Sequence, residues 1–139
     1  MEIREYQCLP KEAMAVRFAV FVEEQGFEDE IDAIDNIATH LVMFDVDGTP
    51  IATCRIFPSD DPARFVLGRL CVVKTHRGMG LGGQMLIEAQ RRVRALGGEM
   101  LSLHSQYHAR GFYERFGFTA FGEIEDEQGC AHIWMKKIL

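Results

Sequence analysis

Apolar and polar residues alternate along several stretches of this chain, which is the pattern of strands that bury one face. The dipeptide Asp47-Gly48 lies between two of these stretches and is a hairpin turn signal. Residues 70–73 are continuously apolar, as in a central strand that is covered on both faces. The pattern therefore predicts strands over residues 2–9, 40–46, 50–57, 64–73, 100–105, 119–122 and 130–137, with a turn over 125–129.

Other stretches carry apolar residues at helical spacing. Pro10 suits the first turn of a helix and Gly26 its end, while Gly97 and Gly98 follow a second helical stretch. The spacing predicts helices over residues 10–26, 80–96 and 108–116, and a short helix or ordered loop over 27–39. This order indicates one α+β domain over residues 1–139, with a mixed, mostly antiparallel central sheet flanked by helices.

Composition excludes several classes of protein. The net charge is −6, whereas a nucleic-acid-binding protein usually carries a basic face. No apolar run approaches the roughly 20 residues of a membrane helix, and the first residues do not resemble a signal peptide, so we expect a cytoplasmic protein. The four cysteines are scattered without a CxxC pair, which indicates neither zinc nor disulfides; they are Cys8, Cys54, Cys71 and Cys130.

Residues 72–86 combine the end of a strand, a glycine-rich turn and the start of a helix. Gly78, Gly80, Gly82 and Gly83 leave little side chain between the backbone and an approaching molecule. A helix that begins there directs unpaired N–H groups and its positive dipole end outward. This stretch therefore predicts a site for a phosphate or pyrophosphate.

Three phosphate motifs compete for this turn. Residues 78–83 match G-x-G-x-x-G, but the hairpin-rich first half leaves no room for the βα repeats of a dinucleotide-binding fold, which we keep only as an alternative. A P-loop needs a Gly-Lys-Ser/Thr sequence, which does not follow here. Residues 77–82, Arg-Gly-Met-Gly-Leu-Gly, match the third motif, R/Q-x-x-G-x-G/A.

With this third motif the chain resembles the GNAT superfamily of N-acyltransferases. Residues 106–118, from Gln106 to Phe118, are similar to the second motif of that family, N-x-x-A-x-x-[FL]-Y-x-x-x-G-F, and one helix and one strand separate the two motifs, as in the family. Residues 20–25, together with Glu30, Asp32, Asp35 and His40, are similar to a small bacterial subgroup. The resemblance covers nearly the whole chain.

The resemblance implies a GNAT fold in which two central strands splay apart and hold acetyl-CoA, with no metal. The backbone of Cys71 and Val73 would bond the pantetheine arm, and the N–H of Val72 would stabilise the oxyanion. Gln106 stands where the family usually has asparagine; its longer amide is also expected to contact CoA, although the exact hydrogen bond of that asparagine does not carry over. The remaining cofactor contacts would come from Phe112 and from the turn, namely Arg77, Gly78, Met79, Gly80, Leu81, Gly82 and Gly83.

The resemblance also implies direct transfer of an acetyl group to a primary amine. Tyr113 matches the family tyrosine that protonates the CoA thiolate, and a phenol with a pKa of roughly 10 can act as this acid. We select His40 as the general base from the candidates His40, His104, Glu23, Glu24, Glu28 and Asp32. An acyl-cysteine route through Cys71 is disfavoured because apolar surroundings raise the pKa of a thiol.

The acceptor of the acyl group is not specified by these motifs. Residues 23–35 are rich in carboxylates, including Glu30, which suggests a cationic small molecule or a basic peptide end. Two alternatives remain: a module that binds acyl-CoA without turnover, and an acyltransferase that uses longer acyl chains. A homodimer is plausible for the family, whereas no nucleic acid or membrane is expected.

Overall fold

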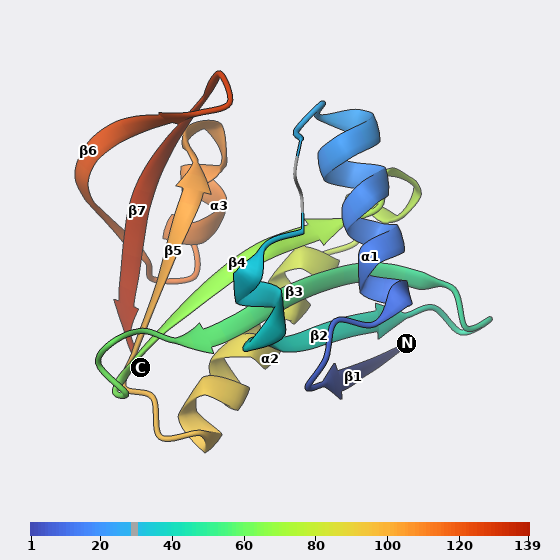
Figure 1. Ribbon diagram of the computed structural model, residues 1–139, viewed down its shortest axis with the longest axis horizontal. Helices are drawn as coiled ribbons and strands as arrows, with labels where there is room; N and C mark the ends of the chain where they lie inside the picture. Colours follow the sequence, from blue (N-terminus) through green and yellow to red (C-terminus); the bar gives the residue numbers. More distant parts are fainter. Residues whose placement is uncertain (29–30) are drawn as a thin grey trace.

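The computed structural model describes residues 1–28 and 31–139. In this part of the chain seven strands form one mixed sheet in the order β1-β2-β3-β4-β5-β7-β6 (Figure 1). Only the β4–β5 pair is parallel among the described strand pairs. The strands are β1 (Glu2–Tyr6), β2 (Thr39–Phe44), β3 (Pro50–Pro58), β4 (Arg64–Val72), β5 (Met100–Gln106), β6 (Thr119–Glu127) and β7 (Cys130–Ile138).

Helices cover both faces of this sheet (Figure 1). The α-helices are α1 (Lys11–Arg17), α2 (Leu81–Ala95) and α3 (Arg110–Glu114). A π-helix, η1 (Phe18–Glu24), continues directly from α1. The described residues also form three short 3-10 helices: η2 (Ala33–Asn36), η3 (Lys74–His76) and η4 (Tyr107–Ala109).

Strand β2 shows why α1 and α2 lie on opposite faces. Leu41 and Met43 belong to the main apolar core, which also holds the buried side of α2. Val42 and Phe44 point to the other face and pack against Ala13 of α1. Successive side chains of a strand alternate between faces, so a continuously apolar strand serves two helix layers at once.

The sheet divides between β4 and β5. These strands pair only from Arg64↔Met100 to Leu67↔Leu103, and beyond that point they diverge (Figure 1). On its other side β4 carries one extra residue relative to β3 around Arg69, whose φ is +54°. A bulge of this kind bends a strand locally. The expected splay of two central strands is therefore present.

Several predicted boundaries were wrong. The helix predicted over residues 10–26 changes from α to π geometry after Arg17, because a few apolar positions do not distinguish a spacing of 3.6 from a wider turn. The turn predicted over 125–129 contains only Gln128 and Gly129, since β6 runs on to Glu127. This strand is exposed throughout and lacks the alternation that reveals a strand.

The acidic segment after Gly26 contains the short helix η2, which Asp32 caps and Asp35 supports in a capping box. Asp29 and Glu30, which belong to the carboxylates expected near the acceptor, lie outside the described residues. Within residues 1–28 and 31–139, no helix has the length and apolar character needed to span a membrane.

Candidate active site

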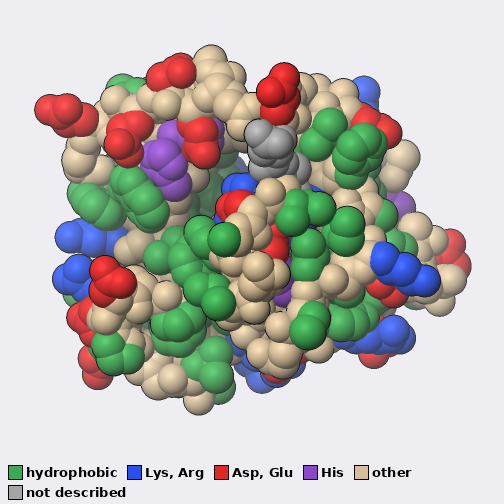
Figure 2. Space-filling view, in the orientation of Figure 1, with side chains coloured by type: hydrophobic (Ala, Val, Ile, Leu, Met, Phe, Trp, Pro, Cys, Tyr) green, Lys and Arg blue, Asp and Glu red, His purple; other side chains and the backbone are tan. Residues whose placement is uncertain are grey.

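A cavity of about 720 Å³ occupies the region where β4 and β5 diverge. Its walls come from η1, β3, β4, β5, α3, β6 and β7, and from the described residues Gln25, Phe27, Glu28, Asp32 and Ile34. Figure 2 shows a hollow here, with histidine and acidic side chains gathered along one rim. The cavity is large enough for a small-molecule site, and its walls combine apolar and charged side chains.

The residues predicted to bind the cofactor divide into two groups. Cys71, Val72, Arg77 and Gln106 line the cavity. The second group lies around the start of α2, apart from the cavity wall; it comprises Val73, Gly78, Met79, Gly80, Leu81, Gly82, Gly83 and Phe112. The cavity and the helix start are thus adjacent through Arg77, which belongs to the turn and also lines the cavity.

The turn has the backbone geometry of an anion site. Gly78 and Gly80 have φ values of +79° and +75°, which L side chains adopt only with strain. Gly80 is the N-cap of α2 and supplies no side-chain cap to its first N–H groups. Gly82 and Gly83 also have a packing role, because a Cβ would lie 3.4 Å from Phe112 and 2.6 Å from Phe116 of the adjacent α3 segment.

The backbone of β4 beside the cavity is partly engaged. Val73 donates its N–H to Ile51 and accepts a bond from His76, so its polar groups already have partners. This arrangement argues against the predicted pantetheine bonds at Val73. Consecutive N–H groups of a strand point to opposite sides, so the N–H of Val72 is directed away from β3 and toward the gap.

Two residues predicted to bind the cofactor, Arg77 and Gln106, form hydrogen bonds to residues at the end of η1. The guanidinium of Arg77 pairs with Glu24 (Nη2–Oε1 2.6 Å) and also donates from Nε to the Val72 carbonyl. The hydrogen bond from Arg77 lowers the pKa of Glu24. The Gln106 amide donates to Gln25 (2.8 Å). An incoming anion would therefore compete with Glu24 for Arg77.

Tyr113 lies on α3 at the cavity wall, on the sheet face that also carries α2. Its ring packs edge-on against Phe112 and Phe118. Burial raises the pKa of Tyr113 well above its usual range, and the nearby thiols of Cys54 and Cys71 add to this effect. The phenol is therefore protonated at neutral pH and can donate its proton.

His40 does not reach the cavity. It is 1% exposed, and its Nε2 donates to the backbone carbonyl of Asp35 (3.0 Å). Burial lowers the pKa of His40, although the bond to Asp35 opposes this change. The structure does not bring His40 together with Tyr113, so it loses its place as our candidate base. Among the other candidates, His104, Glu28 and Asp32 line the cavity.

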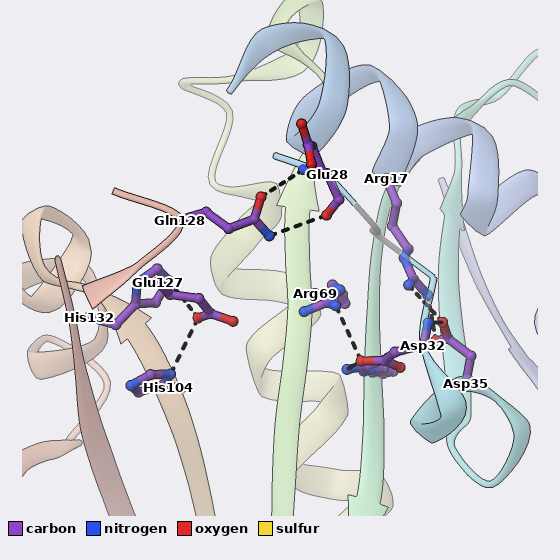
Figure 3. Close-up of polar contacts among 10 residues, drawn as sticks. Arg17, Glu28, Asp32, Asp35, Arg69, His104, Glu127, Gln128 and His132 are labelled. Carbon is purple, nitrogen blue, oxygen red and sulfur yellow. Dashed lines mark hydrogen bonds and ion pairs between the residues drawn. The ribbon is translucent and has the colours of Figure 1, made fainter. Parts of the chain in front are cut away.

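An unpredicted ion-pair network crosses from α1 to β3 (Figure 3). Arg17 binds Asp35 through two hydrogen bonds (2.7 and 2.9 Å), and Arg55 binds both Asp35 and Asp32. Burial would raise the pKa of Asp35, but these hydrogen bonds hold it well below its ordinary value. Arg69 adds a contact to Asp32 (3.3 Å).

These ion pairs bear on the prediction that the acidic segment attracts a cationic acceptor. Asp32, Asp35 and Glu24 all face arginine partners, so their charges are already compensated within the chain. The charge of these three residues therefore gives little support to a cationic acceptor.

A second unpredicted cluster contains His104, His132 and Glu127, all of which line the cavity (Figure 3). The Oε2 atom of Glu127 lies 3.5 Å from His132 Nε2 and 3.6 Å from His104 Nδ1. The sequence analysis names only His104 of these three, as a candidate base. The contacts among the three depend on β7 lying between β5 and β6 in the sheet, which the sequence does not show. In the described part of the chain, no group of three or more metal-binding side chains could hold a metal ion.

The comparisons with known proteins agree with the fold and the motifs. Residues 7–139 match the family model described as "Acetyltransferase (GNAT) domain". The "Uncharacterized N-acetyltransferase YjcF" of Bacillus subtilis is 35% identical over 131 residues, which cover 91% of each chain.

Two solved structures show the same architecture. A candidate N-acetyltransferase from Lactobacillus plantarum superimposes with a TM-score of 0.91 at 32% identity, over 99% of this chain and 97% of that one. An aminoglycoside 6'-N-acetyltransferase complexed with coenzyme A shares the fold at 15% identity (TM-score 0.78, 99% and 97% coverage). The chain is a member of the GNAT acetyltransferase family.

Proposed function

We propose that this protein transfers an acetyl group from acetyl-CoA directly to a primary amine. The observation that carries the proposal is the cavity at the β4–β5 divergence, which Val72 of β4 and Tyr113 of α3 both line. The glycine turn at the start of α2 supports the donor assignment, because its geometry suits the pyrophosphate of CoA. The coenzyme A complex of the aminoglycoside enzyme, which has the same fold, is consistent with this donor.

In this reaction the amine nitrogen attacks the thioester carbonyl carbon and forms the C–N bond. The N–H of Val72 is directed toward the gap and would stabilise the oxyanion that develops. The C–S bond then breaks, its electron pair goes to sulfur, and Tyr113 donates its proton to the thiolate. One of the two N–H protons of the attacking amine passes to the tyrosinate and restores the Tyr113 phenol, while the other stays on the amide nitrogen.

The acceptor is an amine that enters the same cavity. Glu28 and Glu127 line this cavity, and neither belongs to the arginine network. We therefore retain a cationic acceptor as a proposal, now based on these two carboxylates rather than on Asp32 and Asp35. Spermidine and hexylamine separate the two cases, because only spermidine carries further positive charges beyond the reacting amine.

The test is the release of CoA thiol from acetyl-CoA in the presence of a panel of primary amines. Tyr113→Phe should lower kcat by about 10²-fold or more, the usual contribution of a positioned acid, while acetyl-CoA still binds with its wild-type Kd in calorimetry. A kcat within threefold of wild type would contradict the role of Tyr113. Binding of acetyl-CoA without thiol release from any amine would favour a non-catalytic module, and faster turnover of butyryl-CoA would favour longer acyl chains.

A further inference from the structure

The cluster of His104, His132 and Glu127 is built from three different strands. His104 lies on β5, His132 on β7 and Glu127 on β6. The strand register brings them together, since His104 pairs with Trp134 and Glu125 pairs with His132. Residues two apart on a strand share a face, so these side chains all emerge on one side of the sheet.

That side is opposite to Tyr113. Leu103 and Ser105 flank His104 on β5 and are buried, and Leu103 belongs to the same core as Tyr113 and α2. His104 therefore points to the other face, where Phe27 also packs against His132. An acyl group held between β4 and β5 would have the phenol on one side and this cluster on the other.

Hydrogen bonds and stacking fix the two imidazoles. His132 Nδ1 lies 2.9 Å from the Cys130 carbonyl, which can only accept, so this nitrogen carries the proton and Nε2 has a lone pair when the ring is neutral. The ring of His104 stacks on Trp134 (4.8 Å between centroids, 24° between planes). Its Nε2 is 3.2 Å from Glu125 and buried beneath it, without the alignment of a hydrogen bond.

The shorter contact of His104 runs from Nε2 to Glu125 (3.2 Å, against 3.6 Å from Nδ1 to Glu127), so we place the proton of the neutral ring on Nε2. In this tautomer the Nδ1 lone pair of His104, the Nε2 lone pair of His132 and the Glu127 carboxylate are three acceptors with no donor between them. The separations of 3.5 and 3.6 Å are longer than hydrogen bonds. Such an arrangement favours a group that brings several N–H donors, and a primary ammonium brings three.

We infer that this cluster binds the ammonium form of the acceptor and removes its proton. This inference rests on the proposed function. Glu127 accepts an N–H bond from the ammonium group, His104 Nδ1 takes one proton, and the neutral amine then attacks the thioester. The resulting imidazolium lies between Glu125 and Glu127 and later releases its proton to water. The Nε2 lone pair of His132 accepts a further N–H bond from the same ammonium group.

The experiment compares His104→Gln with wild type, using the most reactive amine of the panel. The expected result is a fall in kcat/KM of about 10²-fold and loss of the acidic limb of the pH profile, because glutamine cannot take up the proton. The Glu123→Gln variant is the control, since Glu123 is exposed on β6 and does not line the cavity. Calorimetry with CoA should give the same Kd for all three proteins.

Partial rescue of His104→Gly by added imidazole would support a base, because a structural role would not respond. A His104→Gln enzyme with an unchanged pH profile and a kcat/KM within threefold of wild type would overturn the assignment and leave the proposed function standing. A wild type that acetylates no amine would overturn both.

Glu127→Gln provides an independent arm if the histidine variants do not fold. Its side chain is half exposed, so the substitution leaves the core intact. The KM for the amine should rise about tenfold while the KM for acetyl-CoA stays constant, with exposed Glu123→Gln on the same strand as the control. Equal amine KM values for Glu127→Gln and Glu123→Gln would overturn the ammonium site.

Discussion

Replacing Asp35 by asparagine removes one charge from the most buried ion-pair network of the molecule while keeping the shape of the side chain. Asp35 is 2% exposed and accepts hydrogen bonds from Arg17 and Arg55, which are 1% and 3% exposed. The substitution leaves these two buried guanidinium groups with less compensating charge.

The magnitude follows from burial. Removing one partner of a buried ion pair costs about 3–5 kcal/mol, and we expect the lower value because the asparagine oxygen still accepts a hydrogen bond. Unfolding entropy of about 2.1 cal/mol/K per residue over 139 residues is roughly 0.3 kcal/mol/K. A loss of about 3 kcal/mol therefore lowers the Tm by about 10 °C.

Urea denaturation at pH 7, followed by far-UV circular dichroism, measures this loss. Exposed Asp60→Asn is the control and should change the free energy of unfolding by no more than about 0.5 kcal/mol. A destabilisation below about 1 kcal/mol for Asp35→Asn would refute the reasoning, since it would place the network in an environment as screened as a surface pair.

The same comparison has a defined pH dependence. The folded protein holds the pKa of Asp35 far below its ordinary value of 3.8, so its carboxylate stabilises the fold fully above that value. This contribution decreases as the pH falls below 3.8 toward the folded pKa. The difference between wild type and Asp35→Asn should therefore be constant from pH 7 to about 5 and shrink in stronger acid. A difference that grows in acid would contradict the assignment.

Two further substitutions test the cofactor end of the site. Glu24→Gln releases Arg77 from its ion pair, so CoA should bind about three- to tenfold more tightly at low salt. This gain in affinity should vanish near 1 M salt, where surface charges are screened. Calorimetry measures the Kd for CoA, and Glu23→Gln is the control. Gly83→Ala places a methyl group 2.6 Å from Phe116, and the overpacking of about 1–3 kcal/mol should exceed the roughly 1 kcal/mol gained in helix propensity. Thermal unfolding that shows Gly83→Ala as stable as Gly111→Ala, where a Cβ meets open space, would contradict this packing.

Local patterns in the sequence predicted the parts of the fold that local physics determines. The Asp47-Gly48 turn, the helix over residues 80–96 and the glycine turn before it all appear where residue spacing placed them, with small shifts of boundary. The π-helix was missed because its apolar positions also fit an α-helix.

The polar clusters could not be predicted for a different reason. Arg17 meets Asp35 across 18 residues, and Arg55 meets the same carboxylate across 20. His104 of β5 lies near Glu127 of β6 because both strands pair with β7, which lies between them in the sheet. Such contacts depend on the order of the strands, which residue spacing along one chain does not specify.

Because β4 and β5 pair over a short ladder, the sheet consists of two hydrogen-bonded blocks of strands. Backbone hydrogen bonds join strands β1, β2, β3 and β4 into one block, and strands β5, β7 and β6 into another. The β4–β5 ladder between the two blocks is four residue pairs long. Apart from this ladder, the two blocks are joined by side chains of the shared core, to which Leu67 of β4 and Leu103 of β5 both belong. A molecule bound in the gap would contact both blocks, so we expect its binding to raise the free energy needed to open the β4–β5 ladder.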